Sequence, residues 1–116
     1  MLDRARMRLL IRNLVDNALR HGGVSTMPPV VTTARASSSV RLVVRDHGPG
    51  VDESQLARLA EPFYRTDAAR QRSTGGIGLG LYLCRLVAQA HGGTLTPRTA
   101  QPGLEIEVEL PVQRTG

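Results

Sequence analysis

Residues 104–110 constrain the fold more than any other segment of this chain. Four apolar residues alternate there with three glutamates, in the order Leu104-Glu105-Ile106-Glu107-Val108-Glu109-Leu110. Successive side chains of a β-strand point to opposite faces, so the segment predicts a strand with one apolar face and one charged face. Such a strand belongs in a sheet that is covered on one side and open to water on the other.

Two segments have the apolar spacing of helices that could cover this sheet. Residues 3–21 contain no glycine or proline and are apolar at positions 7, 10, 11, 14, 15 and 18. Asp3 can cap this helix and Gly22-Gly23 can end it. A second helix is predicted from Gly78, with apolar positions 79, 81, 83, 86, 87 and 90, and His91-Gly92-Gly93 supplies the glycine that ends many helices.

The remaining elements are short. Strands are predicted at 30–33, 40–44 and 93–97, a short helix from Asp52 to about Leu59, and an aperiodic polar stretch at 66–76. Helices and strands do not alternate strictly, which favours an α+β fold over a parallel doubly wound sheet. We expect a two-layer sandwich in one domain, residues 1–116, with a mixed sheet covered on one face by about three helices.

Composition excludes several classes of protein. A chain of 116 residues with 41% hydrophobic residues suits one core. No run of about 18 apolar residues predicts a membrane span or secretory signal, and the single cysteine, Cys84, fits a reducing cytoplasm. The net charge of +5 attracts phosphates of any kind, but only three aromatic residues could stack on bases: Phe63, Tyr64 and Tyr82. Nucleic-acid binding therefore ranks low.

The first predicted helix carries a polar stripe beside its apolar one. Asn13, Asn17 and the Arg20-His21 pair are spaced three or four residues apart and share a face. Amide oxygens can ligate a hard cation, and arginine can meet phosphate. A solvated face is the plainer interpretation, but Arg8, Arg12 and Asp16 already form a row suited to water, which leaves the asparagine stripe available for a ligand.

Three further clusters could carry chemistry. Asp46-His47-Gly48-Pro49-Gly50 follows a strand, where a buried carboxylate could accept a hydrogen bond from an amino group such as that of adenine. Residues 74–81, Thr-Gly-Gly-Ile-Gly-Leu-Gly-Leu, place glycine amides before a helix, as phosphate sites do. They lack the Gly-Lys-Ser/Thr ending of a P-loop and the setting of a dinucleotide fold. The third cluster does not indicate a function by itself; it is Glu61-Pro62-Phe63-Tyr64-Arg65.

The order of these segments resembles the asparagine, first glycine, phenylalanine and second glycine boxes of sensor histidine kinases. Asn-x-x-x-Asn, Asp-x-Gly-x-Gly, Pro-Phe-Tyr-Arg and Gly-x-Gly-x-Gly follow one another over almost the whole chain. The resemblance implies the ATP-binding sandwich of the GHKL superfamily and a catalytic domain that uses ATP and Mg²⁺.

The resemblance also implies roles for individual residues. Asn17 corresponds to the principal Mg²⁺ ligand, supported by Asn13, and Arg65 to an arginine that reaches the γ-phosphate, which makes Asn17 and Arg65 the catalytic residues. Asp46 would bind the adenine amino group, and residues 66–76 would form a lid. The remaining nucleotide contacts would come from Arg20, His21, Gly48, Gly50, Gly76, Gly78, Leu79 and Gly80.

The chain departs from the family pattern at two places. Gly103-Leu104 stands where many members have Gly-Thr, so one polar contact to the site is not expected. A further strand and a helical hairpin bearing the phospho-accepting histidine, expected before the first helix, are not in this sequence. His21, His47 and His91 lie inside the recognised segments and do not resemble the acceptor.

The expected partners follow from the resemblance. They are ATP, the parent protein's own dimerisation domain and a response regulator. The parent is expected to be a homodimer anchored in the inner membrane, with this domain in the cytoplasm. Three alternatives remain: a GHKL ATPase or anti-sigma-type serine kinase, a non-catalytic nucleotide-sensing interaction module, and a basic nucleic-acid binder.

Overall fold

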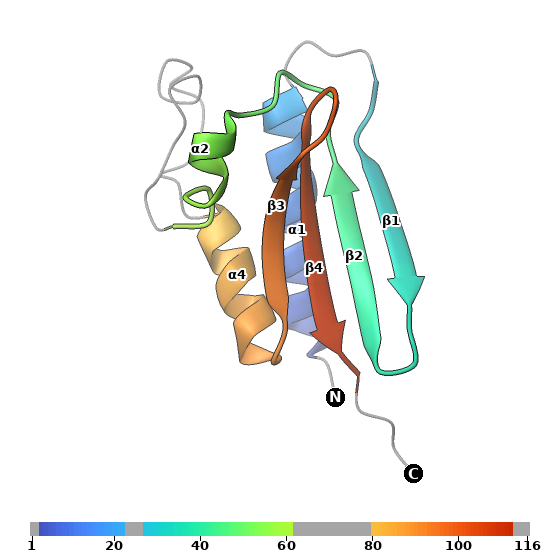
Figure 1. The fold of residues 1–116 in the computed structure, drawn as a ribbon. Coiled ribbons are helices and arrows are strands. Elements are labelled where there is room, and N and C mark those ends of the chain that lie inside the picture. The colour runs from blue at the N-terminus through green and yellow to red at the C-terminus, as the bar shows by residue number, and fades with distance from the viewer. Residues whose placement is uncertain (1–2, 23–26, 62–79, 113–116) are drawn as a thin grey trace.

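The computed structural model of the chain describes residues 3–22, 27–61 and 80–112 (Figure 1). Its helices and strands match the predicted segments to within a few residues at each end. In chain order they are α1 (Arg4–Gly22), β1 (Val30–Arg35), β2 (Ser39–Arg45), α2 (Glu53–Leu56), α4 (Gly80–Ala90), β3 (Thr94–Thr99) and β4 (Leu104–Pro111).

The four described strands form one sheet in the order β1-β2-β4-β3 (Figure 1). All three pairings are antiparallel, so the mixed sheet that we expected is not found among the described strands. The physical reason lies in the connections, because β1–β2 and β3–β4 are joined by short turns that reverse the chain. Pro97 is tolerated inside β3 because β3 is an edge strand.

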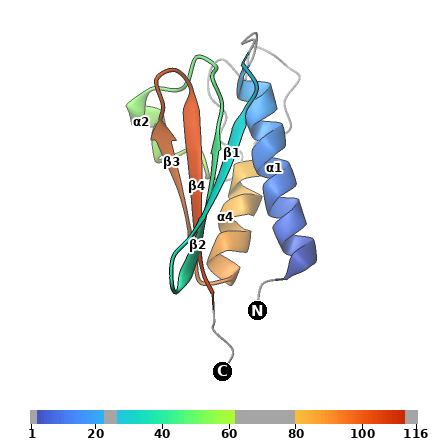
Figure 2. The same ribbon diagram turned by 90° about the vertical axis from the view of Figure 1, so that its right-hand side faces the viewer.

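Two layers are visible when the molecule is seen along the sheet (Figure 2). The long helices α1 and α4 lie side by side against one face, and no described helix covers the other face. The short helix α2 lies beside β3 rather than over the middle of the sheet (Figure 1). The α+β sandwich is thus confirmed, and among the described helices α1 and α4 cover the face of the sheet.

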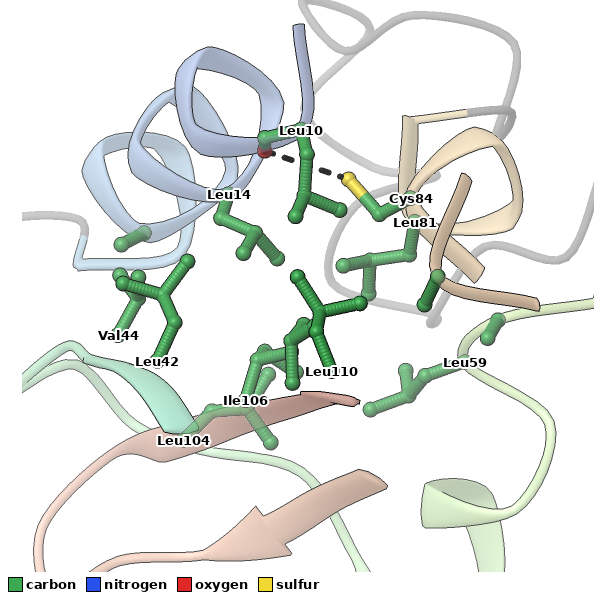
Figure 3. Close-up of a cluster of buried hydrophobic side chains, with 14 residues drawn as sticks. Leu10, Leu14, Leu42, Val44, Leu59, Leu81, Cys84, Leu104, Ile106 and Leu110 are labelled. Carbon is green, nitrogen blue, oxygen red and sulfur yellow. Dashed lines mark hydrogen bonds between the residues drawn. The ribbon is translucent and has the colours of Figure 1, made fainter. Parts of the chain in front are cut away.

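The core lies between the two layers, as the alternation in residues 104–110 predicts (Figure 3). The four apolar residues of β4 are at most 4% exposed, and Leu14 of α1 is fully buried. The buried hydrophobic residues of the described chain are Leu10, Leu14, Ala18, Leu42, Val44, Leu59, Ala60, Leu81, Cys84, Ala88, Leu104, Ile106, Val108 and Leu110.

Cys84 is a core residue, as its place on the apolar side of the last helix predicts. Its side chain is 1% exposed, and its thiol lies 3.6 Å from the carbonyl oxygen of Leu10 (Figure 3). Burial raises the pKa of this thiol to about 12, because the thiolate would lose its hydration. The thiol is therefore protonated at neutral pH, which argues against a redox role.

The predicted end of α1 at Gly22, its predicted cap at Asp3 and the predicted glycine end of α4 are confirmed. The Arg6 amide of α1 donates to the Asp3 carboxylate over 3.1 Å, an N-terminal cap. At the end of α4, Gly92 has a φ of +78°, and the Gly93 amide donates to the Ala88 carbonyl, closing the helix with a Schellman-type turn.

His91 joins the two long helices at this end. Its Nδ1 lies 2.8 Å from the Val87 carbonyl oxygen, and its Nε2 accepts a hydrogen bond from the Asp3 amide over 3.3 Å. The start of α1 and the end of α4 are therefore tied together.

The open face of the sheet carries ion pairs centred on Glu107. Its carboxylate lies 2.9 Å from Arg98 and 3.4 Å from Arg41, and its side chain is only 14% exposed. The hydrogen bond from Arg98 and the positive charges lower the pKa of Glu107. A lowered carboxyl pKa stabilises the fold above the pKa of the unfolded chain, and the contribution is lost as pH falls through the folded value.

Glu107→Gln is therefore expected to lower the free energy of unfolding at pH 7 by about 0.5–1 kcal/mol. The difference from the parent chain should shrink below about pH 4.5, as the parent carboxylate is protonated. Urea unfolding between pH 3 and 7 measures it. Glu109→Gln is the matched control, because the Glu109 side chain is 46% exposed and lies 3.6 Å from Arg41. A pH-independent difference for Glu107→Gln would contradict this account.

No helix in the described ranges is both long enough and apolar enough to span a membrane.

Candidate functional site

Asp46 is the buried charged residue among the described positions, at 2% exposure. It follows the last residue of β2, at the end of the molecule where α1 also ends (Figure 1). Its Oδ1 accepts hydrogen bonds from the Gly48 amide over 3.0 Å and from the Leu104 amide over 3.1 Å. Two backbone donors on one oxygen hold the carboxylate in a fixed orientation, and neither bond uses Oδ2.

The glycines after Asp46 shape this loop. Gly48 is buried and donates to Asp46, and Gly50 has a φ of +73°, which side chains rarely allow. A Cβ at Gly50 would lie 2.9 Å from the Gly103 carbonyl oxygen. The loop therefore packs on the β3–β4 turn with no room for larger residues, as the forced turn in the sequence predicts.

The asparagine stripe of α1 is only partly buried. Asn13 and Asn17 have intermediate exposure, whereas Arg8, Arg12 and Asp16 are exposed, which confirms the separate solvated row. The Asn13 amide nitrogen donates to the Leu9 carbonyl oxygen over 2.9 Å, so its own helix uses the donor half of this side chain. Its amide oxygen is the half that suits a cation.

Asn13 and Asn17 belong to α1, which lies beside α4 (Figure 2). The contacts of Cys84 with Leu10 and of His91 with Asp3 show that the helices run antiparallel, because Leu10 and Asp3 are seven residues apart, as are Cys84 and His91. Extending this register toward Gly80 brings the first turn of α4 level with Asn13.

Gly80 is the first residue of α4 and is exposed. A Cβ there would meet nothing within 4 Å in the described part of the chain, so packing does not require glycine at this position. Close approach of a ligand to the backbone remains a reason for it. Arg20 lies on the exposed side of α1 near its end.

Several predicted site residues lie outside the description. Arg65, Gly76, Gly78 and Leu79, together with the expected lid at 66–76, fall in residues 62–79, and the side chain of His21 is also outside it. Their assigned roles stay predictions. Among the described residues, no three His, Cys, Asp or Glu side chains gather where they could hold a metal ion.

Sequence reasoning missed the contribution of the β3–β4 turn. No polar contact from the Leu104 side chain was expected, and that side chain is in the core at 2% exposure. Its main chain contacts Asp46 instead: the Leu104 amide donates to Oδ1, and the Leu104 carbonyl accepts from the Asp46 amide over 2.9 Å. The one sequence signal was the glycine at position 103.

Comparison with known proteins agrees with this fold. Residues 2–114 match the family described as histidine kinase-, DNA gyrase B-, and HSP90-like ATPase. The signal transduction histidine-protein kinase BaeS of Escherichia coli is 39% identical over 115 residues, which are 97% of this chain and 24% of that protein. The chain thus spans about a quarter of the length of this relative.

Two solved structures show the same fold. The mycobacterial sensor histidine kinase MprB superposes with a TM-score of 0.81 at 30% identity, covering 97% of this chain and 76% of that one. Full-length ShkA, solved in complex with AMPPNP, gives a TM-score of 0.78 at 27% identity, covering 96% of this chain and 22% of that one. The chain belongs to the family of histidine kinase-, DNA gyrase B- and HSP90-like ATPases, and the predicted likeness to sensor histidine kinase catalytic domains is confirmed.

Proposed function

We propose that this chain binds Mg-ATP and donates its γ-phosphate to a histidine on the separate dimerisation helix of its parent kinase, for relay to an aspartate of a response regulator. The observation that carries this proposal is the buried Asp46 carboxylate, fixed through Oδ1 by two amides. A fixed, buried carboxylate beside a strand end is a strong acceptor for one amino group, and the 6-amino group of adenine fits it. ShkA, which has this fold, was solved with an ATP analogue.

The phosphates would lie toward the asparagine stripe and the start of α4. Backbone amides at a helix start favour anions, and no described atom lies within 4 Å of a Cβ placed at Gly80, so phosphate oxygens could come close to the described backbone there. Asn17 and Asn13 would offer amide oxygens to Mg²⁺, whose other ligands would be phosphate oxygens and water. Because no carboxylate cluster gathers among the described residues, the metal is best held when it arrives with ATP. Arg20 and Arg65 would balance the charge of the transferring group.

The described histidines support an acceptor outside this chain. Both ring nitrogens of His91 are engaged, with Val87 and Asp3. His47 Nδ1 is buried without a hydrogen-bond partner in the described ranges. A nucleophilic imidazole needs an accessible nitrogen in line with the γ-phosphate.

The proposal extends to the domain organisation and location of the parent protein. Residues 1–116 form one catalytic domain of a longer, homodimeric parent, and this domain is cytoplasmic while the parent is anchored in the inner membrane. The support for a longer parent is that the chain covers 24% of BaeS, and the support for one domain is that the MprB structure covers 97% of this chain.

Thermal unfolding with ATP, with and without Mg²⁺, followed by phosphotransfer, tests the function. At about 100 times its dissociation constant, a ligand adds about 2.7 kcal/mol to the free energy of unfolding, and we expect the larger shift with Mg²⁺. With labelled ATP, the chain alone should label slowly, whereas the parent's dimerisation domain added in trans should become phosphorylated on histidine.

Rapid labelling of the chain alone, or acid-stable phosphoserine on a partner, would contradict the histidine kinase assignment. The second result would favour the serine kinase alternative. Absence of any shift at millimolar ATP would contradict nucleotide binding itself.

A further inference from the structure

The β3–β4 turn, residues 100–103, packs directly on Asp46 and its loop. Asp46 and Leu104 exchange two hydrogen bonds: the Leu104 amide donates to Oδ1, and the Asp46 amide donates to the Leu104 carbonyl oxygen. These residues are 58 positions apart in sequence. The carboxylate orientation therefore depends on where this remote turn lies.

Gly103 has to be glycine for the turn to approach so closely. Its φ is +105°, and a Cβ there would overlap the Asp46 main-chain carbonyl and come within 2.8 Å of Oδ1. Backbone atoms cannot move aside as a flexible side chain can, so any larger residue would displace the turn or the carboxylate. Both outcomes change the hydrogen bonds that fix Oδ1.

Two other contacts hold the turn in place. The Ala100 amide donates to the Gly103 carbonyl oxygen over 3.0 Å, closing the turn. From β2, Arg45 Nη2 donates to the Pro102 carbonyl oxygen over 3.2 Å. Arg45 precedes Asp46 in the chain, so two adjacent residues bind Pro102 and Leu104, on the two sides of Gly103.

We propose that Gly103 and Arg45 are positioning residues that, through the β3–β4 turn, fix the Asp46 carboxylate and thereby set the preference of the site for adenine over other purines. The inference rests on the proposed nucleotide site. The purine itself is read by Asp46; the turn holds Oδ1 on the Leu104 and Gly48 amides, which leaves Oδ2 aimed at the ligand. A carboxylate that is free to rotate would accept hydrogen bonds equally well from donors of other purines. The preference for adenine would then be lost, while the affinity for the phosphates would be retained.

Paired titrations of Gly103→Ala and the parent chain with ATP and inosine triphosphate test this. Inosine triphosphate has an oxygen where ATP has its amino group, so it presents an acceptor to the carboxylate. The parent chain should prefer ATP about 10- to 100-fold, as a hydrogen bond to a charged group predicts. In Gly103→Ala the preference should fall below about 3-fold, while affinity for inosine triphosphate changes by less than about 3-fold.

Gly92→Ala is the matched control. Gly92 also has a positive φ, of +78°, but a Cβ there would meet only Pro111 Cγ at 3.4 Å, an ordinary contact far along the sheet from Asp46. Both substitutions strain the backbone, so both should lower thermal stability. Only Gly103→Ala should lower base selectivity, a readout that a purely structural role would not move.

Arg45→Met is the second test variant, for use if Gly103→Ala fails to fold. It removes the bond to Pro102 without introducing a clash, and the preference for ATP should fall at least about 3-fold. A parent chain that binds neither nucleotide, or both alike, would contradict the proposed function. A parent chain that prefers ATP, with a foldable Gly103→Ala or Arg45→Met that keeps the full preference, would overturn the positioning role alone.

Discussion

Asp46→Asn removes the stabilisation that Mg-ATP gives this chain and leaves the ligand-free fold nearly unchanged; this is the largest effect on binding that we expect. Asparagine keeps an Oδ1 that can accept from Gly48 and Leu104, the two bonds seen at 3.0 and 3.1 Å. It replaces Oδ2 with a donor, which then faces the donor group of adenine. The variant thus changes the chemistry of recognition with little change in packing.

The measurement is thermal unfolding at an ATP concentration about 100 times the dissociation constant of the parent chain. The parent should gain about 2.7 kcal/mol, and Asp46→Asn less than about 0.4 kcal/mol, the value at one dissociation constant. Asp46→Ala is the informative contrast, because it leaves the buried Gly48 and Leu104 amides without an acceptor and should destabilise the ligand-free fold by about 1–3 kcal/mol. A full ATP shift in Asp46→Asn would exclude Asp46 as the adenine acceptor.

Leu14→Ala should produce the largest loss of stability. Leu14 is fully buried between α1 and the sheet, so the substitution loses apolar burial and leaves a cavity (Figure 3). The expected cost is about 2–5 kcal/mol, a large part of the 5–15 kcal/mol typical of a domain. The melting temperature should fall by roughly 10 °C or more.

Leu19→Ala on the same helix is the control for Leu14→Ala. The Leu19 side chain is 58% exposed, so its truncation should change the free energy of unfolding by less than about 0.5 kcal/mol. Urea unfolding gives both values from the transition midpoint at constant slope. Similar losses in the two variants would mean that α1 does not pack on the sheet as described.

Local patterns identified most elements because local forces dominate them. The alternation in residues 104–110 predicted the buried face of β4, and the spacing in residues 3–21 predicted α1 with Asp3 as its cap. The glycines at 92 and 93 marked the end of α4. Each of these signals acts within a few residues, where periodicity and capping chemistry are readable. Asp46 was likewise recognisable, because a strand end followed by Gly48 and Gly50 forces a turn.

Other features depended on contacts between distant segments. No local pattern specifies that β4 inserts between β2 and β3, which makes the described sheet antiparallel. The α2 segment proved too short to cover the sheet. The sequence also could not show that the Asn13 amide nitrogen binds the Leu9 carbonyl of its own helix, because the surroundings of a side chain select its rotamer.

The sequence by itself determined which segments are helix or strand and which faces are apolar. It also determined that a carboxylate and glycines lie near the ends of these elements, and that two asparagines share one face of the first helix. Only the tertiary structure decided that the Leu104 amide holds Asp46 and that Gly103 has to be small. The physical reason is that a hydrogen bond across 58 residues forms only when burial of both layers brings the two strand ends together. Periodicity sets what each segment can bury, and packing of the whole sheet sets which atoms then meet.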